Sequence, residues 1–155
     1  MKNKRIYKYR AKRKDNGEWV YGSLVVYHKP NSNEIEEVLI VSQNARIFKD
    51  EFKGYDDAVV DIDTVGEFTD MLDCEDEFIY EGDILRNEEL KLLEVVAFQD
   101  GGYVLKIFTE LSKGNVEFTG VCGIAEYPLD KDRIVGNIWD NADLLGKYKG
   151  VNYEV

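Results

Sequence analysis

The chain has 155 residues, of which 44% are hydrophobic and 33% charged, and its formal net charge is −11. This length suits one compact domain or two small lobes, and the composition excludes a disordered chain. Two cysteines and one histidine exclude a disulfide framework and the common zinc patterns, and no apolar run approaches the ~18 residues of a membrane span.

The charges are distributed unevenly along the chain. Residues 1–14 carry eight Lys or Arg and no acid, so the remainder carries a net charge of −19. Within residues 50–83, fourteen Asp or Glu face a single base, Lys53. Mutual repulsion in this stretch must be relieved by solvation or by a cationic partner.

Alternating basic and apolar residues predict the first strand, residues 4–11, and a second follows at 18–27. Asn16-Gly17 between them supplies the conformations of a tight hairpin. The basic stripe of Lys8, Arg10 and Lys12 has two interpretations: a phosphate-binding surface, or the solvated face of a strand that balances acidic neighbours. The acidic net charge favours the second.

Further strands are indicated by short runs of β-branched and aromatic residues between turn residues. The segment 43–55 is ambiguous, Asp100-Gly101-Gly102 predicts a second hairpin, and a short helix capped by Asn141 and closed by Gly146 is expected near the end. The expected strands are 36–41, 59–63, 83–86, 92–99, 103–108 and 134–139. Together these elements predict a mainly β protein, a barrel or a sandwich.

No linker or repeat divides the chain. We therefore expect one domain spanning residues 1–155, built from two tightly associated β lobes, about 1–60 and 61–147, with a loose tail at 148–155.

Several motifs in a fixed order resemble the YopX family of phage and prophage proteins. They are Thr64-Val65-Gly66-Glu67-Phe68-Thr69, Ile79-Tyr80-Glu81-Gly82-Asp83-Ile84, Val135-Gly136-Asn137-Ile138 with Leu144-Leu145, and the opening Arg10-Ala11 through Trp19-Val20-Tyr21-Gly22-Ser23-Leu24. The resemblance implies a phage or prophage origin, SH3-type barrel-like rolls with a short C-terminal helix, and no established activity or catalytic residues.

The chain departs from the family at one turn. The family commonly has Thr-Gly-Leu followed by an Asp-Lys-Asn-Gly-Lys type of turn, whereas residues 69–77 here contain neither glycine. The sequence therefore does not determine the geometry of this turn. The tip of the turn is acidic. Gly66, Gly82 and Gly136 are interpreted as structural glycines, because a missing side chain permits turns and close crossings.

Motifs of nucleotide, acyl-transfer and zinc chemistry are missing, so we expect neither an enzyme nor a cofactor. The acidic neighbours of Cys74 and the apolar surroundings of Cys122 predict unreactive thiols, and His28 is expected to be an exposed loop residue. Acids between Asp61 and Glu77 can in principle bind Ca²⁺ or Mg²⁺, but they lack an EF-hand pattern.

We interpret the chain as a cytoplasmic, non-enzymatic module of the host bacterial cell that binds a protein partner or a second copy of itself. The expected contact residues are Asp73, Glu75, Asp76 and Glu77, with Lys8, Arg10 and Lys12 as basic candidates. The alternative is a nucleic-acid binder that uses the basic, tyrosine-rich N-terminal strand. A Mg²⁺-dependent hydrolase or nuclease is the least favoured interpretation.

Overall fold

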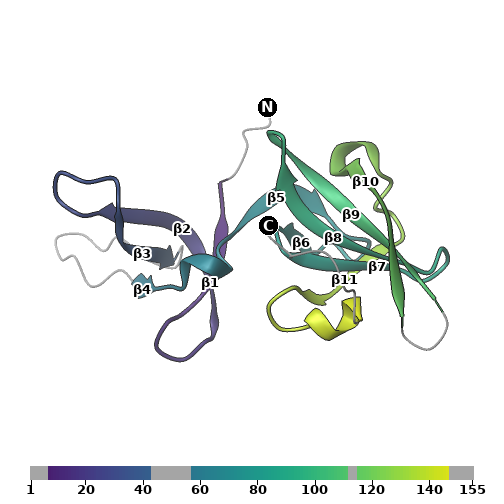
Figure 1. Ribbon diagram of the computed structural model, residues 1–155, viewed down its shortest axis with the longest axis horizontal. Helices are drawn as coiled ribbons and strands as arrows, with labels where there is room; N and C mark the ends of the chain where they lie inside the picture. Colours follow the sequence, from purple (N-terminus) through teal and green to yellow (C-terminus); the bar gives the residue numbers. More distant parts are fainter. Residues whose placement is uncertain (1–6, 43–56, 112–114, 147–155) are drawn as a thin grey trace. The chain divides into compact units, whose positions relative to one another are not determined.

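A computed structural model describes residues 7–42, 57–111 and 115–146 of the chain. The described residues are mainly antiparallel β-structure, as the sequence predicts, with short 3₁₀ turns (Figure 1). The chain divides into two compact units, Met1–Phe68 and Thr69–Val155. We call them the N-terminal and the C-terminal unit. None of the described helices is long and apolar enough to cross a membrane.

The N-terminal unit is one antiparallel sheet with the strand order β4-β3-β2-β1-β5. An apolar cluster holds its strands together and includes Ala11, Ile40 and Val60, all at most 1% exposed. The last strand continues past Phe68 into the C-terminal unit. The bounds are β1 (Tyr9–Lys12), β2 (Trp19–His28), β3 (Ile35–Ser42), β4 (Asp57–Val59) and β5 (Gly66–Leu72).

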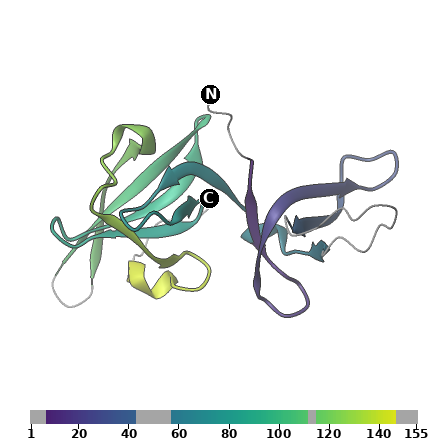
Figure 2. The same ribbon diagram turned by 180° about the vertical axis from the view of Figure 1, so that it is seen from behind.

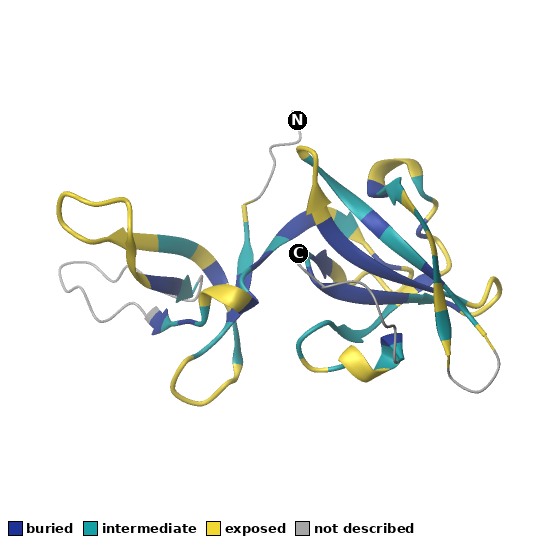
Figure 3. Cartoon of the chain, viewed as in Figure 1, coloured by how far each residue is buried: buried dark blue, intermediate teal, exposed yellow. Residues whose placement is uncertain are grey.

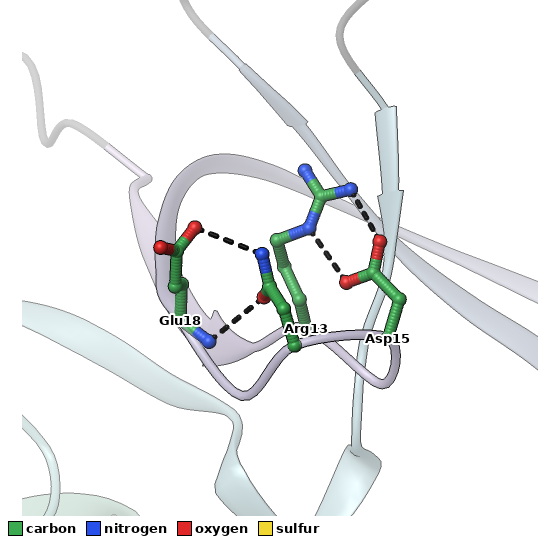
Figure 4. A network of polar contacts seen from close by, with 4 residues as sticks. Arg13, Asp15 and Glu18 are labelled. Carbon is green, nitrogen blue, oxygen red and sulfur yellow. Dashed lines mark hydrogen bonds and ion pairs between the residues drawn. The ribbon is translucent and has the colours of Figure 1, made fainter.

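The hairpin between β1 and β2 forms where the sequence predicts it. Gly17 has a φ of +74°, a conformation that favours glycine. Polar side chains fix the turn (Figure 4): Arg13 donates to both carboxylate oxygens of Asp15 at 2.9 and 2.7 Å, and Asn16 and Glu18 bond reciprocally at 2.9 and 3.0 Å. The hydrogen bond from Arg13 lowers the pKa of Asp15.

The C-terminal unit contains a five-stranded antiparallel sheet with the order β10-β9-β8-β7-β11. The second half of β5 and the short strand β6 complete the strands of the unit. The hairpin of β8 and β9 turns at Asp100 and Gly101, both with positive φ, as predicted. The bounds are β6 (Phe78–Tyr80), β7 (Asp83–Asn87), β8 (Leu92–Gln99), β9 (Gly102–Glu110), β10 (Val116–Gly123) and β11 (Asp132–Asn137).

Both faces of this sheet are covered, which explains the continuous burial of the middle of β8 (Figure 3). One face packs in a cluster with Ile79, Ile124 and Leu129. The other face packs against the 3₁₀ turn η4 (Ala142–Leu145), whose Leu145 is fully buried; η4 is the yellow element of Figures 1 and 2. A strand buried on both faces is apolar in sequence rather than alternating.

Several details differ from the sequence-based predictions. The described strands form open sheets, not the closed SH3-type barrels that the resemblance implies, because β10 and β11 are edges that do not pair with each other. The expected C-terminal helix is a 3₁₀ turn, and the Asn141 side chain accepts from the Asn137 amide instead of capping it. Asp61 and the 3₁₀ turn η1 (Ile62–Thr64) occupy the end of the strand predicted at 59–63.

Three strands, β5, β6 and β10, were not predicted. Asp70 interrupts the pattern of β5 with a positive φ of 63°, β6 has three residues, and β10 contains a register shift between Phe118 and Gly120. Irregularities of this kind weaken the period-2 signal on which strand prediction depends. The segment 43–55 and the tail 148–155 lie outside the described residues.

Two aspartates within residues 69–77 have a glycine-like backbone conformation. Asp70 has a φ of +63° and Asp76 a φ of +64°, both in the left-handed region that favours glycine. Aspartate tolerates the left-handed region better than most residues, but a side chain there still costs free energy. These two positions therefore cost the folded state some stability.

Asp76→Gly is expected to stabilise the C-terminal unit by about 0.5–1 kcal/mol, because glycine removes the strain at positive φ. A shift of the urea unfolding midpoint measures the effect. Asp76→Ala is the matched control and is expected to destabilise, since alanine keeps the strain and loses the polar side chain. Equal midpoints for the glycine and alanine variants would contradict this explanation.

Candidate interaction surface

The turn between β5 and β6 forms an acidic tip, residues 72–78. Asp73 organises it: Oδ1 accepts hydrogen bonds from the backbone amides of Glu75 at 2.8 Å and Glu77 at 3.0 Å. The backbone adds bonds from the Asp73 amide to the Glu77 carbonyl and from the Asp76 amide to the Asp73 carbonyl. A short side chain that accepts amides two and four residues ahead fixes the turn locally.

The predicted contact residues of the tip fall into two groups. Asp73 is only 6% exposed and serves as the anchor, so it does not offer its carboxylate to a partner. Glu75, Asp76 and Glu77 are exposed. Sequence reasoning missed the apolar contribution: Leu72 and Phe78, which flank the acids, are 41% and 46% exposed. The tip thus combines three carboxylates with two large apolar side chains.

The acidic tip is fastened to β11 within the same unit. The Cys74 amide donates to the Asp132 carbonyl at 2.9 Å, and the Ile134 amide donates to Oδ2 of Asp73, also at 2.9 Å. Asp73 therefore accepts three backbone hydrogen bonds, one of them from a residue 61 positions away. Two backbone groups of β11 that face away from β7 are occupied by the tip.

The predicted structural role of Gly82 follows from its surroundings. Its φ is +83°, and a Cβ there would lie 2.3 Å from the Trp139 ring. The adjacent Asp83 accepts the Tyr80 amide at 2.8 Å, and the Gly82 carbonyl accepts the Ile138 amide at 2.9 Å. Gly136 is crowded in the same way, with a built Cβ 2.3 Å from Asn141 Oδ1. These glycines permit close packing.

Gly82→Ala is expected to destabilise the C-terminal unit by about 2 kcal/mol, from backbone strain together with displacement of the Trp139 ring. The measurement is chemical unfolding followed by the fluorescence of Trp139. Gly101→Ala is the matched control, because its φ is +86° but nothing lies within 4 Å of a built Cβ. If both variants lose the same stability, strain alone accounts for the effect and the ring contact contributes nothing.

The basic residues of the first strand surround an aromatic ring. Arg10 and Lys12 lie two positions apart, on one face of β1, and their charged groups lie 5.0 and 5.5 Å from the centroid of the Trp19 ring. Both distances are within cation–π range. Arg10 is only 6% exposed, whereas Lys8 and Lys12 are half-buried. The expectation of a solvated basic face is therefore wrong for Arg10.

The most unusual ionisable groups were not singled out from the sequence. Glu94 in β8 and Asp132 at the start of β11 are both 0% exposed. The Tyr127 hydroxyl donates to Oε1 of Glu94 at 3.1 Å, while Oε2 of Glu94 and both carboxylate oxygens of Asp132 make no full hydrogen bond to the described residues. A lone acid within the apolar run 92–97 is the sequence signal that marks Glu94.

Burial is the main cause of the altered acidity in this pair. Burial, together with the charge of Asp132, raises the pKa of Glu94 to about 7, against the opposing hydrogen bond from Tyr127. Burial likewise raises the pKa of Asp132, with the Asn87 amide acting in the opposite direction. Burial and the two carboxyl groups raise the pKa of Tyr127. The pair therefore favours its protonated form.

The two thiols and His28 are the remaining candidates for reactive side chains. Loss of hydration and the charges of Asp73 and Glu75 raise the pKa of Cys74, and burial raises that of Cys122, so the reactive thiolates are disfavoured at both sites. His28 ends β2 and is exposed, with Nδ1 3.1 Å from the Asn33 carbonyl. Within residues 7–42, 57–111 and 115–146, no three His, Cys, Asp or Glu side chains are arranged to hold a metal ion.

Comparison with known proteins agrees with the motifs described above. The sequence model of the YopX protein family matches residues 8–146, which is most of the chain and includes both units. No curated protein matches the chain.

Proposed function

This chain belongs to the YopX family, and from that premise we propose that it is a non-enzymatic, phage- or prophage-encoded protein that binds a basic protein partner through the acidic tip. The observation that carries the proposal is the anchoring of the tip by Asp73. Three backbone hydrogen bonds to one buried carboxylate hold the backbone of the turn in place. A preformed loop loses little conformational entropy on binding.

The chemistry of the acidic tip indicates the kind of partner. Three exposed carboxylates attract a basic surface and accelerate its association, while Leu72 and Phe78 provide apolar area that contact with a partner can bury. An exposed charge by itself contributes little to affinity. Apolar side chains beside the charges contribute more, because contact with the partner excludes water from them. A complementary partner therefore carries Lys or Arg around an apolar pocket.

The burial of Glu94 and Asp132 supports a non-enzymatic role. These are the carboxyl groups whose acidity is altered most, and such groups often mark catalytic sites. Both are fully enclosed in the core of the C-terminal unit, where a dissolved substrate does not reach them. Their acidity is better explained as a property of the folded core.

Binding to nucleic acid is the less favoured function, because Arg10 is buried and both Arg10 and Lys12 already contact Trp19. We place the protein in the cytoplasm of the host bacterial cell, where a phage protein would meet its partners. Titration with single- and double-stranded DNA and RNA at low salt tests the alternative, since phosphate contacts strengthen as salt falls.

The proposal is tested by recovering partners with the tagged full-length chain from phage-infected or prophage-induced host cells. The tip variant Glu75→Gln/Asp76→Asn/Glu77→Gln removes three charges, and asparagine at position 76 keeps the tolerance of positive φ. We expect this variant to lose most of the partner that the unaltered chain recovers, and the remaining binding to weaken less as salt rises.

The matched control is Asp100→Asn/Glu117→Gln/Asp143→Asn, which removes three exposed charges from the same unit. This control should recover the partner as the unaltered chain does. Light scattering of the purified protein identifies a second copy as the partner, if a dimer forms that the tip variant abolishes. Equal recovery of the same proteins by the tip variant and the unaltered chain would overturn the proposal.

A further inference from the structure

Two fully buried carboxyl groups, Glu94 and Asp132, lie in the core of the C-terminal unit, and the charge of Asp132 acts on Glu94. The described side chains that act on Glu94 are Asp132 and Tyr127, and neither supplies a positive charge. Of the other titratable groups, Asp130 acts on Asp132, while the charge of Asp132 acts on the Cys74 thiol and that of Glu94 on the Cys122 thiol. Burying a second negative charge here is costly, so the pair is most stable while it holds a proton.

Asp132 belongs to a segment that is also hydrogen-bonded to the acidic tip. Residues 124–132, which we call the covering segment, include Tyr127 and the buried Ile124 and Leu129, and they close one face of the sheet. The segment ends at Asp132, whose carbonyl accepts the Cys74 amide of the tip. Two residues further, the Ile134 amide binds the Asp73 carboxylate.

The tip is therefore connected to the buried pair through main-chain hydrogen bonds. Glu94 is fully buried and is bonded to Tyr127 of the covering segment, so its exposure to water requires this segment to move. A displacement of Asp132 withdraws the acceptor of the Cys74 amide and disturbs the Ile134 contact with Asp73. Opening of the covering segment and loosening of the tip are consequently one event, not two.

We propose that the Glu94–Asp132 pair is a proton-operated latch, which holds the acidic tip against β11 while the pair retains a proton and releases the tip when that proton is lost. This regulation rests on the proposed function, because the tip is the surface that it controls. Release makes binding weaker, since a loosened tip must be ordered again by its partner. Tip-dependent binding is thus favoured on the acidic side of neutrality.

Amide hydrogen exchange of the full-length protein, measured from pH 5 to 9, tests the latch without any partner. Rates at Cys74, Glu77 and Ile134 are divided by the intrinsic rate at each pH, which leaves the opening ratio. Because Glu94 releases its proton at about pH 7 when buried and at its ordinary 4.5 when exposed, the opening ratio should increase about tenfold from pH 6 to pH 8 and then level off.

Three variants separate a titrating latch from a merely structural contact. Glu94→Gln keeps an acceptor for Tyr127 but cannot titrate, so its opening ratio should change less than about twofold over this range. Asp132→Asn removes the charge that disfavours ionised Glu94 and should move the increase to lower pH. Tyr127→Phe removes the hydrogen bond that favours ionised Glu94 and should move it to higher pH.

Glu117→Gln on β10 is the matched control and should keep the increase of the unaltered chain. Constant opening ratios in the unaltered chain, or the same increase in Glu94→Gln, would overturn the latch. If Glu94→Gln does not fold, the other two variants still test the latch, because they should shift the pH of the increase in opposite directions. A shift of both variants in the same direction would overturn the latch. The exchange measurement involves no partner, so its failure is distinguishable from failure of partner recovery by the tip variant.

Discussion

Asp73→Ala is expected to lower the free energy of unfolding of the C-terminal unit by about 3 kcal/mol. The side chain is 6% exposed and accepts three backbone amides, two within the acidic tip and one from Ile134. Hydrogen bonds to a charged acceptor contribute about 1.5–3 kcal/mol each, but water can replace those at the exposed end of the turn. The largest part of the loss comes from the amide of Ile134.

Urea unfolding measures this loss. Asp73→Asn retains one carbonyl oxygen and should lose about half as much stability, whereas the neighbouring Glu75→Ala, an exposed site, should remain within about 0.5 kcal/mol of the unaltered protein. The loss of stability should therefore be largest for Asp73→Ala, intermediate for Asp73→Asn and smallest for Glu75→Ala. A loss below about 1 kcal/mol in Asp73→Ala would show that the anchor is replaceable and that the tip is ordered by other contacts.

The stability of the C-terminal unit is expected to decrease by about 3 kcal/mol between pH 4.5 and pH 8 because of Glu94. Its pKa is about 7 in the folded unit and 4.5 when exposed, so the folded state binds the proton more tightly. The stabilisation is fully present below the unfolded pKa and is lost as pH rises through the folded one. A difference of 2.5 pKa units corresponds to about 3 kcal/mol.

The chain offers a convenient reporter for this pH dependence. It contains two tryptophans, Trp19 and Trp139, one in each unit. In a Trp19→Phe background, Trp139 fluorescence follows unfolding of the C-terminal unit, and subtraction of the Glu94→Gln curve isolates the contribution of Glu94. A difference between the two curves that stays constant from pH 5 to pH 8 would show that Glu94 does not titrate in this range.

Local patterns predicted much of the fold. Asn16-Gly17 and Asp100-Gly101 mark hairpins that form at these positions, because Gly17, Asp100 and Gly101 adopt positive φ values that few other residues tolerate. The strand predicted at 92–99 coincides with β8. Closure into barrels was a wrong expectation, since closure depends on whether the edge strands β10 and β11 meet, and no local pattern encodes that pairing.

The candidate site was predicted in part. Exposed acids at 75–77 follow from composition, because a charged turn is most stable in water. The anchoring role of Asp73 depends on Ile134, and the burial of Arg10 on the fold around β1, so neither is visible in the neighbouring sequence. The same separation along the chain hides the pairing of Glu94 with Asp132.

The amino-acid sequence by itself determined the β character, the two hairpins, the acidic turn and the family of this protein, since each depends on neighbouring residues or on motifs in a fixed order. Only the tertiary structure decided that Asp73 is an anchor and that Glu94 and Asp132 are buried in the core. The physical reason is that burial and long-range hydrogen bonds depend on residues far apart in the chain. Acidity and exposure are properties of that environment, not of the residue type.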